Sequence, residues 1–491
     1  MKQHQLPFVF ADSPTGSGCD ESTGEPAGKA YLLQTAKARK VPSFTTPADD
    51  TSRLLNDVVS SRNLAAALLH VASKKGAPGV DGRSIGEVVA VAHRLLPCLR
   101  RDLLSGRYHP GDIRRKWIPK PGGGERGLGI PNVVDRWVQQ AIHQVLSPLF
   151  EPSFHGSSHG FRPGRGARTS LAEAQENLGE ERTWVASLDL SKFFDRVNHQ
   201  RLLSRLALRI DDGRLLCLIH RLLKAKVVLP DGTRVLSVEG TPQGGPLSPL
   251  LSNVVLDELD QELERRGLHF VRYADDVNIF VGSERAGHRV MTSISRFIVR
   301  RMRLAINEKK SIVARPEDVH ILGFSLHPQA DGQVEVHLSA RSCQRLATRI
   351  RELTPRNWGA SLARCIFRVN RYLGGWLGYF RLCTEGGAQL FKRYDARIRR
   401  RIRAIVVRQK KRPRHLYRHL RARGVTHGAA AKAAWSRRGP WYTSCRWGLH
   451  RAYPNAWFHE RMTSLWHDWS RHQAPRGVSG QLNLFGPEIP T

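Results

Sequence analysis

The segment that most constrains the fold is residues 270–280, where two apolar, β-prone runs flank the adjacent carboxylates of Asp275 and Asp276. This pattern predicts an antiparallel hairpin with both acids at its turn, where paired negative charge stays hydrated or meets a cation. A second apolar run, residues 184–189, ends in Asp189. A carboxylate at the end of a buried strand is costly unless a cation or a hydrogen-bond donor meets it. If these strands lie side by side, the three acids converge.

Three clustered carboxylates without a metal would repel one another, and their pKa values would rise. With two Mg²⁺ ions, Asp189, Asp275 and Asp276 would form a clamp for in-line attack at phosphorus. One ion would activate the incoming hydroxyl and the other would neutralise the leaving phosphates, with Mn²⁺ as a substitute metal. For the Asp-Asp pair taken alone, a polar turn without a metal is the alternative.

The Tyr-Ala-Asp-Asp sequence at residues 273–276, together with Asp189 and the Phe-Phe-Asp sequence at 193–195, resembles the palm of a reverse transcriptase. The surrounding sequence resembles the group II intron-encoded reverse transcriptase and maturase family. The resemblance implies an α+β fold of the right-hand polymerase type, with fingers, a palm built on an antiparallel sheet, and a helical thumb. It also places Tyr273 and Ala274 at the nucleotide-binding site.

The chain is too long for one hydrophobic core. We expect a disordered N-terminal extension (1–52), fingers and palm (53–330), a helical thumb or maturase domain (331–405), a basic, helical, DNA-binding-like module (406–472) and a flexible tail (473–491). Many family members end in an HNH-type endonuclease with paired cysteines. Because no Cys-x-x-Cys pair occurs here, we expect that domain to be absent.

The formal net charge of +35 indicates a polyanionic partner rather than ordinary surface solubility. We find no apolar run long enough to span a bilayer and no signal peptide, so a membrane partner is not expected. The seven cysteines are scattered without metal-ligand spacing, which fits a reducing compartment. The expected location is the bacterial cytoplasm, in association with the nucleoid.

Two glycine-rich basic segments are candidates for nucleotide binding. Residues 117–131 predict a hairpin carrying Lys120 and Arg126, whose charges suit closure over a triphosphate. An ordinary exposed hairpin is equally compatible with the residues alone; in the family this is the fingers hairpin over the incoming nucleotide. Residues 159–166 resemble the second fingers motif of the family, with Arg162 as a contact to nucleotide or template.

Three further residues are assigned by their place in the motifs. Phe194, five residues after Asp189, is in register to close the floor of the nucleotide pocket and to exclude a ribose 2′-hydroxyl, with core packing as the alternative. Gln243 lies in a Gly/Pro-rich turn that, from the residues alone, is equally compatible with a structural loop; the resemblance places it beside the templating base pair. Lys310 resembles the palm lysine near the triphosphate, where it could protonate the leaving pyrophosphate; a solvated lysine is the alternative.

The C-terminal half is basic and helical. Residues 392–423 contain fifteen Lys and Arg and one acid, Asp395, and the cations fall on several helix faces. This pattern favours contact with nucleic-acid backbone, which gives affinity with little sequence choice. Residues 435–469 interleave aromatic and basic side chains, and the aromatics either stack on bases or form a small core, the latter being expected for most of them.

The tail contains a short peptide, residues 480–486, that resembles the segment by which bacterial polymerases and repair proteins bind the β sliding clamp. In this hypothesis Leu482, Leu484 and Phe485 fill a hydrophobic pocket while Gln481 hydrogen-bonds at its rim.

The sequence as a whole predicts an RNA-directed DNA polymerase, a nucleotidyltransferase that uses an RNA template, a DNA primer and deoxynucleoside triphosphates (dNTPs). The resemblance adds binding of a structured intron RNA to assist splicing, and mobility into target DNA by target-primed reverse transcription. Two alternatives remain at this point. One is a domesticated reverse transcriptase in DNA repair or defence, and the other is a non-enzymatic splicing cofactor that only binds RNA.

Overall fold

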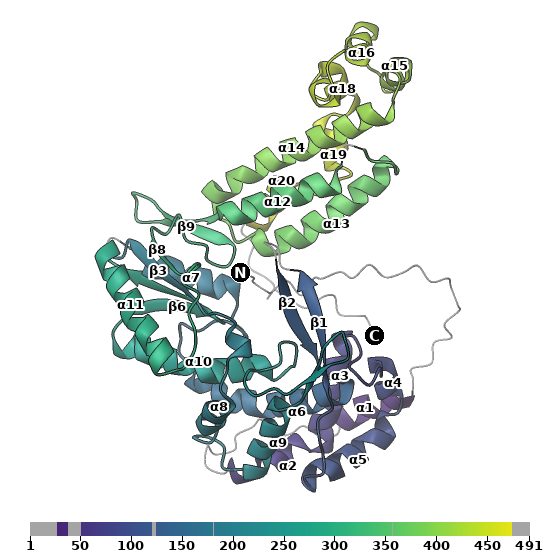
Figure 1. Ribbon diagram of the computed structural model, residues 1–491. Helices are drawn as coiled ribbons and strands as arrows, with labels where there is room; N and C mark the ends of the chain where they lie inside the picture. Colours follow the sequence, from purple (N-terminus) through teal and green to yellow (C-terminus); the bar gives the residue numbers. More distant parts are fainter. Residues whose placement is uncertain (1–26, 38–50, 120–123, 180, 356, 474–491) are drawn as a thin grey trace. The chain divides into compact units, whose positions relative to one another are not determined.

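The computed structural model describes residues 27–37, 51–119, 124–179, 181–355 and 357–473. The chain forms two compact units, Met1–Pro316 and Glu317–Thr491 (Figure 1). Helices and β sheets occur together, which confirms the predicted α+β class. Within the described ranges, no helix combines the length and the apolar composition needed to cross a bilayer.

The acids lie on one sheet of the first unit, which we call the carboxylate sheet. Its neighbouring strands are antiparallel throughout and follow the order β6 (His269–Tyr273), β7 (Asp276–Val281), β3 (Trp184–Asp189) and β8 (Ile312–Ala314). One face contributes Leu188, Val277 and Ile279 to the core of the unit. Helix α11 (Glu284–Arg300) packs against β3, β7 and β8, and α7 (Ala167–Asn177) packs against β6 (Figure 1). The predicted hairpin at residues 270–280 is therefore confirmed.

A second sheet of this unit contains the predicted basic hairpin. Its strands follow the order β2 (Glu125–Ile130), β1 (Ile113–Pro119), β4 (Val227–Val228) and β5 (Arg234–Val235). β1 and β2 pair in antiparallel register from Arg114–Ile130 to Pro119–Glu125, while β4 joins β1 in parallel. The hairpin tip, including Lys120, lies outside the described residues.

The helical core of the first unit is built around α6 (Val133–Phe150). Its Trp137 is fully buried, and the indole Nε1 donates a hydrogen bond of 2.6 Å to the carbonyl of Leu64. Because an apolar ring with a satisfied donor can be buried without penalty, it joins α6 to the helix that carries Leu64. Other elements are α2 (Leu54–Val58), α3 (Ser61–Ser73), α4 (Ile85–Ala90), α5 (Ala92–Leu104), α8 (His199–Leu206), α9 (Gly213–Leu223), α10 (Ser248–Arg265) and the 3-10 turns Thr51–Arg53, Glu151–Ser153 and Phe193–Asp195.

The predicted disordered extension of residues 1–52 is wrong for one segment. Residues Ala27–Lys37 form helix α1, which packs against α3, α4 and α5 and fully buries Leu32. A Cβ at Gly28 would lie 1.9 Å from the carbonyl oxygen of Val89, so the helix approaches the domain closely there. The short apolar period of this helix is hidden in the sequence by its Ser-, Thr- and Pro-rich flanks. The rest of the extension, except the turn at Thr51–Arg53, lies outside the described residues.

The second unit combines a hairpin with a helical domain. The hairpin pairs β9 (Phe324–Pro328) with β10 (Val334–Leu338), and the Phe324 ring lies 5.3 Å from that of Phe380. The helices are α12 (Ala340–Leu353), α13 (Leu362–Phe380), α14 (Glu385–Gln409), α15 (Pro413–Ala422), α16 (His427–Ala434), α17 (Pro440–Thr443), α18 (Trp447–Ala452), α19 (Asn455–His459) and α20 (Leu465–Gln473).

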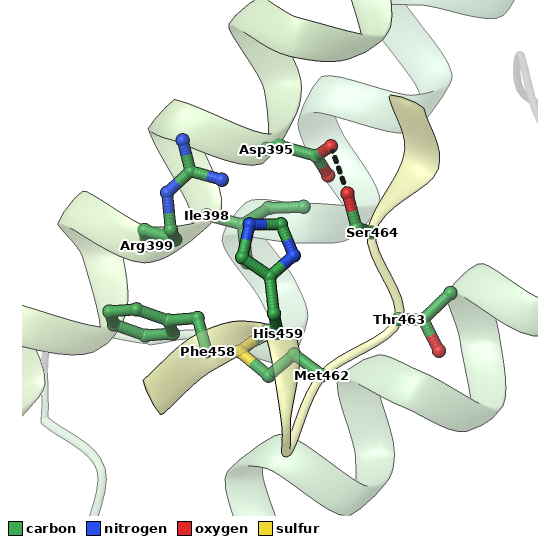
Figure 2. A pocket seen from close by; sticks show the side chains of 8 residues that line it. All are labelled: Asp395, Ile398, Arg399, Phe458, His459, Met462, Thr463 and Ser464. Atoms are coloured by element: carbon green, nitrogen blue, oxygen red, sulfur yellow. Dashed lines mark hydrogen bonds between the residues drawn. The ribbon is translucent and has the colours of Figure 1, made fainter. Parts of the chain in front are cut away.

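The single acid of the basic run is structural. Asp395 on α14 is buried, and its carboxylate accepts hydrogen bonds from Ser464 Oγ at 2.8 Å, Leu465 N at 2.9 Å and Trp466 N at 3.0 Å. These donors belong to the start of α20, which Asp395 therefore caps from another helix. Figure 2 shows this carboxylate beside the small pocket lined by Arg399 and Ser464.

Candidate functional site

The register of the carboxylate sheet places two of the predicted acids opposite one another. Asp189, the last residue of β3, pairs with Asp276, the first residue of β7, and Asp276 also pairs with Tyr273 on β6. Asp275 lies in the turn between β6 and β7. The structure thus brings together, at one end of the sheet, acids that are far apart in the chain.

The turn that carries Asp275 requires an unusual backbone. Ala274 has φ = +56°, in the left-handed region, which is unfavourable for a residue with a Cβ. Arg272, which precedes it by two residues and is completely buried, donates from Nη1 to the Ala274 carbonyl at 3.1 Å. This hydrogen bond closes the turn from the inside of the unit.

The guanidinium of Arg272 is itself fixed by a buried network of residues from α10 and from the loop before α7. It donates to both carboxylate oxygens of Asp260, at 2.6 and 2.5 Å, and this ion pair is fully excluded from solvent. Further hydrogen bonds reach Asn253 Oδ1 at 3.1 Å and Ser158 Oγ at 2.7 Å. A buried charge is tolerated only when it is paired and hydrogen-bonded. The Arg272 guanidinium meets this condition through its ion pair with Asp260 and its further hydrogen bonds.

Gly160 supports the same turn from the other side. A Cβ at this position would lie 2.3 Å from the backbone nitrogen of Ala274, so only glycine allows this approach. The Gly160 carbonyl accepts a hydrogen bond of 2.9 Å from Asn253 Nδ2. Asn253 therefore binds both Arg272 and Gly160, and links the two supports of the Asp275 turn.

Asp189 is contacted by the segment that leads into β8. Asn307 Nδ2 and Lys310 Nζ each lie 3.3 Å from its carboxylate oxygens. The Asp189 backbone also donates to Ser311 Oγ at 3.1 Å and accepts from Asn307 N at 2.8 Å. The structure thus brings Lys310, predicted to lie near the triphosphate, to the carboxylates.

Arg126 and Gln243 contact one another, and Arg126 is close to the acids. Arg126 Nε donates to Gln243 Oε1 at 2.6 Å. Burial lowers the pKa of Arg126, and the nearby carboxylates of Asp275 and Asp195 partly offset this shift. The Gln243 loop is held on β2 because the Gln243 carbonyl accepts from Gly129 N at 2.8 Å. The two predicted nucleotide-binding side chains therefore lie together.

Phe194 adjoins the same loop. It is half-buried in the 3-10 turn Phe193–Asp195, and its carbonyl accepts a hydrogen bond of 2.6 Å from Thr241 N. Its ring packs on the Phe193 ring with centroids 5.4 Å apart. Phe194 follows Asp189 by five residues and is hydrogen-bonded to Thr241, two residues before Gln243. This position is compatible with the predicted gate, which stays a prediction.

Arg162, predicted to contact the nucleotide or template, bonds to groups of its own loop. It is buried, its Nε donates to Glu151 Oε1 at 2.8 Å, and its Nη1 donates to the Ser158 carbonyl at 2.9 Å. These contacts hold the loop before α7 together, so the geometry supports a structural role and gives no support for nucleotide contact. Lys120 and the tail peptide with Gln481, Leu482, Leu484 and Phe485 lie outside the described residues.

Sequence reasoning missed the residues that hold the site rather than form it. A signal was present for Arg272, a charged residue inside an apolar strand. Asn253 and Asp260 are seven residues apart on α10, and therefore lie on one helix face two turns apart. Polar residues on a buried helix face opposite a strand arginine indicate a buried ion pair.

The donor set suits a hard divalent cation, because carboxylate oxygens are the ligands that Mg²⁺ prefers. Among the described residues, however, no group of three or more His, Cys, Asp or Glu side chains is arranged to hold a metal ion. Mg²⁺ sites of this type are completed by substrate phosphates rather than by the protein alone. The acids therefore fit a metal that is bound together with a nucleotide.

In the second unit, several cations of the basic run are used internally. Arg403 is buried and donates to the Tyr453 carbonyl at 2.7 Å, and Arg401 donates to the Thr354 carbonyl at 2.6 Å. Arg400 stacks on the Trp441 ring, 3.9 Å from its centroid. Arginines of the basic run therefore stabilise the helical domain from within, in addition to any charge that the run places on the surface.

The aromatic residues of this region divide between core and surface. Tyr453 and Phe458 are buried, as expected for a small core, whereas Trp441, Tyr442 and Trp447 are exposed by 42%, 37% and 60%. The exposed rings leave base stacking open as a function of this surface.

Paired carboxylates at the end of an antiparallel sheet, faced by a basic hairpin and a glycine-rich loop, define the palm of a nucleic-acid polymerase. Comparison with known families refines this class. Residues 118–326 match the family described as reverse transcriptase (RNA-dependent DNA polymerase), and residues 343–424 match the group II intron maturase-specific domain. These two matched segments together make the chain similar to group II intron-encoded reverse transcriptases and maturases.

Individual relatives agree with this assignment. The chain is 39% identical over 230 residues to protein YkfC of Escherichia coli, covering 46% of this chain and 60% of the relative. It is 34% identical over 173 residues to the group II intron-encoded protein LtrA of Lactococcus lactis, covering 35% and 28%. It is 27% identical over 333 residues to the putative COX1/OXI3 intron 2 protein of Saccharomyces cerevisiae, covering 56% and 39%. The chain thus spans between 28% and 60% of the length of these relatives.

Proposed function

We propose that the protein is an RNA-directed DNA polymerase that also binds its intron RNA to assist splicing and mobility. The observation that supports this most directly is the register that sets Asp189 against Asp276, with Asp275 in the adjoining turn. Two Mg²⁺ ions held by these acids, or Mn²⁺ in their place, would neutralise phosphate charge and activate the primer hydroxyl.

The other residues of the site have roles that follow from their positions. Arg126 is directed at the phosphates of the incoming nucleotide, and its contact with Gln243 couples the hairpin to the loop beside the templating pair. Lys310 is 3.3 Å from Asp189 and is close enough to exchange this carboxylate for a phosphate oxygen. Phe194 closes the pocket against a 2′-hydroxyl.

The direct test is primer extension by the purified full chain on an RNA template with a DNA primer. Asp275→Ala and Asp276→Ala should each abolish incorporation, since removal of one clamp carboxylate disrupts metal binding. Asp231→Ala is the matched control, because Asp231 is an exposed acid in the β4–β5 turn whose carboxylate accepts a hydrogen bond of 2.9 Å from Thr233 N. Extension by the Asp275 variant at the wild-type rate would contradict the proposal.

The proposed RNA and DNA partners rest on the second unit and on the family. We assign the thumb and maturase role to residues 331–405 and nucleic-acid binding to 406–472, and we retain the predicted boundaries as part of this proposal. Splicing of a precursor RNA from the same locus, with and without the protein, measures the maturase role separately from polymerisation. Splicing support that survives Asp275→Ala would separate the two activities.

Docking on the β sliding clamp is proposed from the tail peptide. The test is binding of the purified clamp to the full chain and to a Leu484→Ala, Phe485→Ala double variant. Binding that the double variant loses supports the assignment, and equal binding by both proteins refutes it.

A further inference from the structure

Phe161 combines a strained backbone with an exposed aromatic ring close to the carboxylates. Its φ is +61°, a region that is costly for a bulky L residue, and 39% of the residue is exposed. An exposed phenyl ring also leaves apolar surface in water. Both features are unfavourable for the folded chain alone. A residue held in such a conformation points to a role beyond folding.

The surrounding contacts hold Phe161 in this conformation. On one side, Gly160 is pressed against Ala274, and its carbonyl is bound by Asn253 Nδ2 at 2.9 Å. On the other side, the guanidinium of Arg162 donates to Glu151 Oε1 and to the Ser158 carbonyl. Because both neighbours are anchored, the backbone of Phe161 cannot relax without releasing one of them.

The position of Phe161 determines what its ring can meet. Gly160 contacts the backbone of Ala274, the residue before Asp275. Phe161 is the next residue after Gly160, so it lies beside the turn that carries the acids. Any nucleic acid bound for extension at these acids passes close to this loop. An aromatic ring stacks on every type of base, and this suits a polymerase that must copy any sequence.

We propose that Phe161 is a positioning residue that stacks on an unpaired template base ahead of the primer terminus. Inside a duplex the base faces are already covered by their neighbours, so apart from the terminal pairs a protein ring finds a free face on the single-stranded template. The inference rests on the proposed polymerase function and adds a residue that neither the motif assignments nor the metal chemistry uses.

The test compares two substrates and three variants of the full chain. Binding is measured by fluorescence anisotropy, with no dNTP present, on an RNA–DNA primer–template with a 5′ template overhang and on a blunt duplex of the same sequence. Phe161→Leu keeps the backbone strain and an apolar side chain but removes the aromatic face. It should weaken overhang binding about tenfold, or about 1.4 kcal/mol, and change blunt-duplex binding by less than about twofold. Phe161→Tyr should retain the wild-type preference for the overhang.

Phe161→Gly separates function from folding. Glycine adopts a positive φ without steric cost but has more conformational freedom to lose on folding, and it lacks the contacts of the partly buried ring. The unfolding temperature is therefore measured first, and binding is compared at a temperature where both proteins are folded. The variant should bind the overhang as weakly as Phe161→Leu, and wild-type overhang affinity in the folded variant would overturn the proposal. Equal overhang affinity of wild type and Phe161→Leu would overturn it as well. If the wild-type chain bound neither substrate, the proposed polymerase function would fail together with this inference.

Discussion

The buried ion pair between Arg272 and Asp260 allows a quantitative test of how the site is held. Replacing Asp260 by Asn keeps the shape of the side chain but removes its charge, leaving the Arg272 guanidinium uncompensated in a fully buried position. Breaking one partner of a buried pair typically costs about 3–5 kcal/mol. Since the total stability of a domain is about 5–15 kcal/mol, this is a large fraction of it.

The loss should appear as a lower urea midpoint for the first unit. Because the chain has two units, unfolding should be followed by two probes, and only the transition assigned to the first unit should move. A loss of about 3–5 kcal/mol lowers the ratio of folded to unfolded protein by roughly two to four orders of magnitude. Turnover should also fall, because Arg272 holds the Ala274 carbonyl in the turn before Asp275.

A double substitution separates stability from turnover. Arg272→Met with Asp260→Leu replaces the pair by apolar side chains, a change that is often neutral or stabilising in other proteins. We expect it to restore much of the stability but not the activity, because the hydrogen bond to Ala274 stays absent. A loss below about 1 kcal/mol in Asp260→Asn, or recovery of full activity in the double variant, would refute this reasoning.

Three further outcomes follow from described contacts. Gly160→Ala should reduce turnover by about 10²-fold through displacement of the catalytic turn, whereas Gly156→Ala, which meets no atom within 4 Å, should not; single-turnover extension measures both. Phe194→Val should raise kcat/KM for ribonucleotides relative to deoxynucleotides by about 10-fold or more, and an unchanged ratio would remove the gate assignment. Burial and neighbouring cations lower the pKa of His320 and His419 to about 4. The unfolded chain, with a pKa near 6.5, then binds more protons than the folded chain between these values, so the second unit should lose stability as pH falls through this window. Thermal unfolding measured across that pH range should show a falling unfolding temperature of the second unit. The double variant His320→Gln, His419→Gln should show a smaller fall.

The sequence predicted the placement of the acids more completely than the contacts that support them. The alternation of apolar residues around 270–280 and the acid at the end of residues 184–189 were enough to predict a common sheet end. Side chains that face the nucleotide in the family, such as Arg126 and Gln243, also proved to lie together. The hairpin was predicted correctly because its strand period is a local property of the sequence, whereas the nucleotide contacts of Arg126 and Gln243 stay predictions.

What the sequence did not reveal are contacts that neither periodicity nor spacing predicts. Arg162 bonds to Glu151 and to the Ser158 carbonyl within its own loop, and its expected nucleotide contact stays a prediction. Helix α1 was missed because eleven residues of modest apolar period gain their stability by packing against α3, α4 and α5, with Leu32 fully buried. In both cases the structure depends on a contact partner that neither local propensity nor motif spacing predicts.

The internally bonded arginines of α14 change what salt titrations of RNA binding will measure. A cation contributes to the salt dependence of affinity only if it displaces counterions from phosphates. Arg401 and Arg403 already satisfy protein carbonyls, so the slope should reflect fewer phosphate contacts than the formal net charge of +35 suggests. Alanine scanning along this helix would therefore mix weakened folding with weakened RNA affinity, unless each variant is first matched for stability.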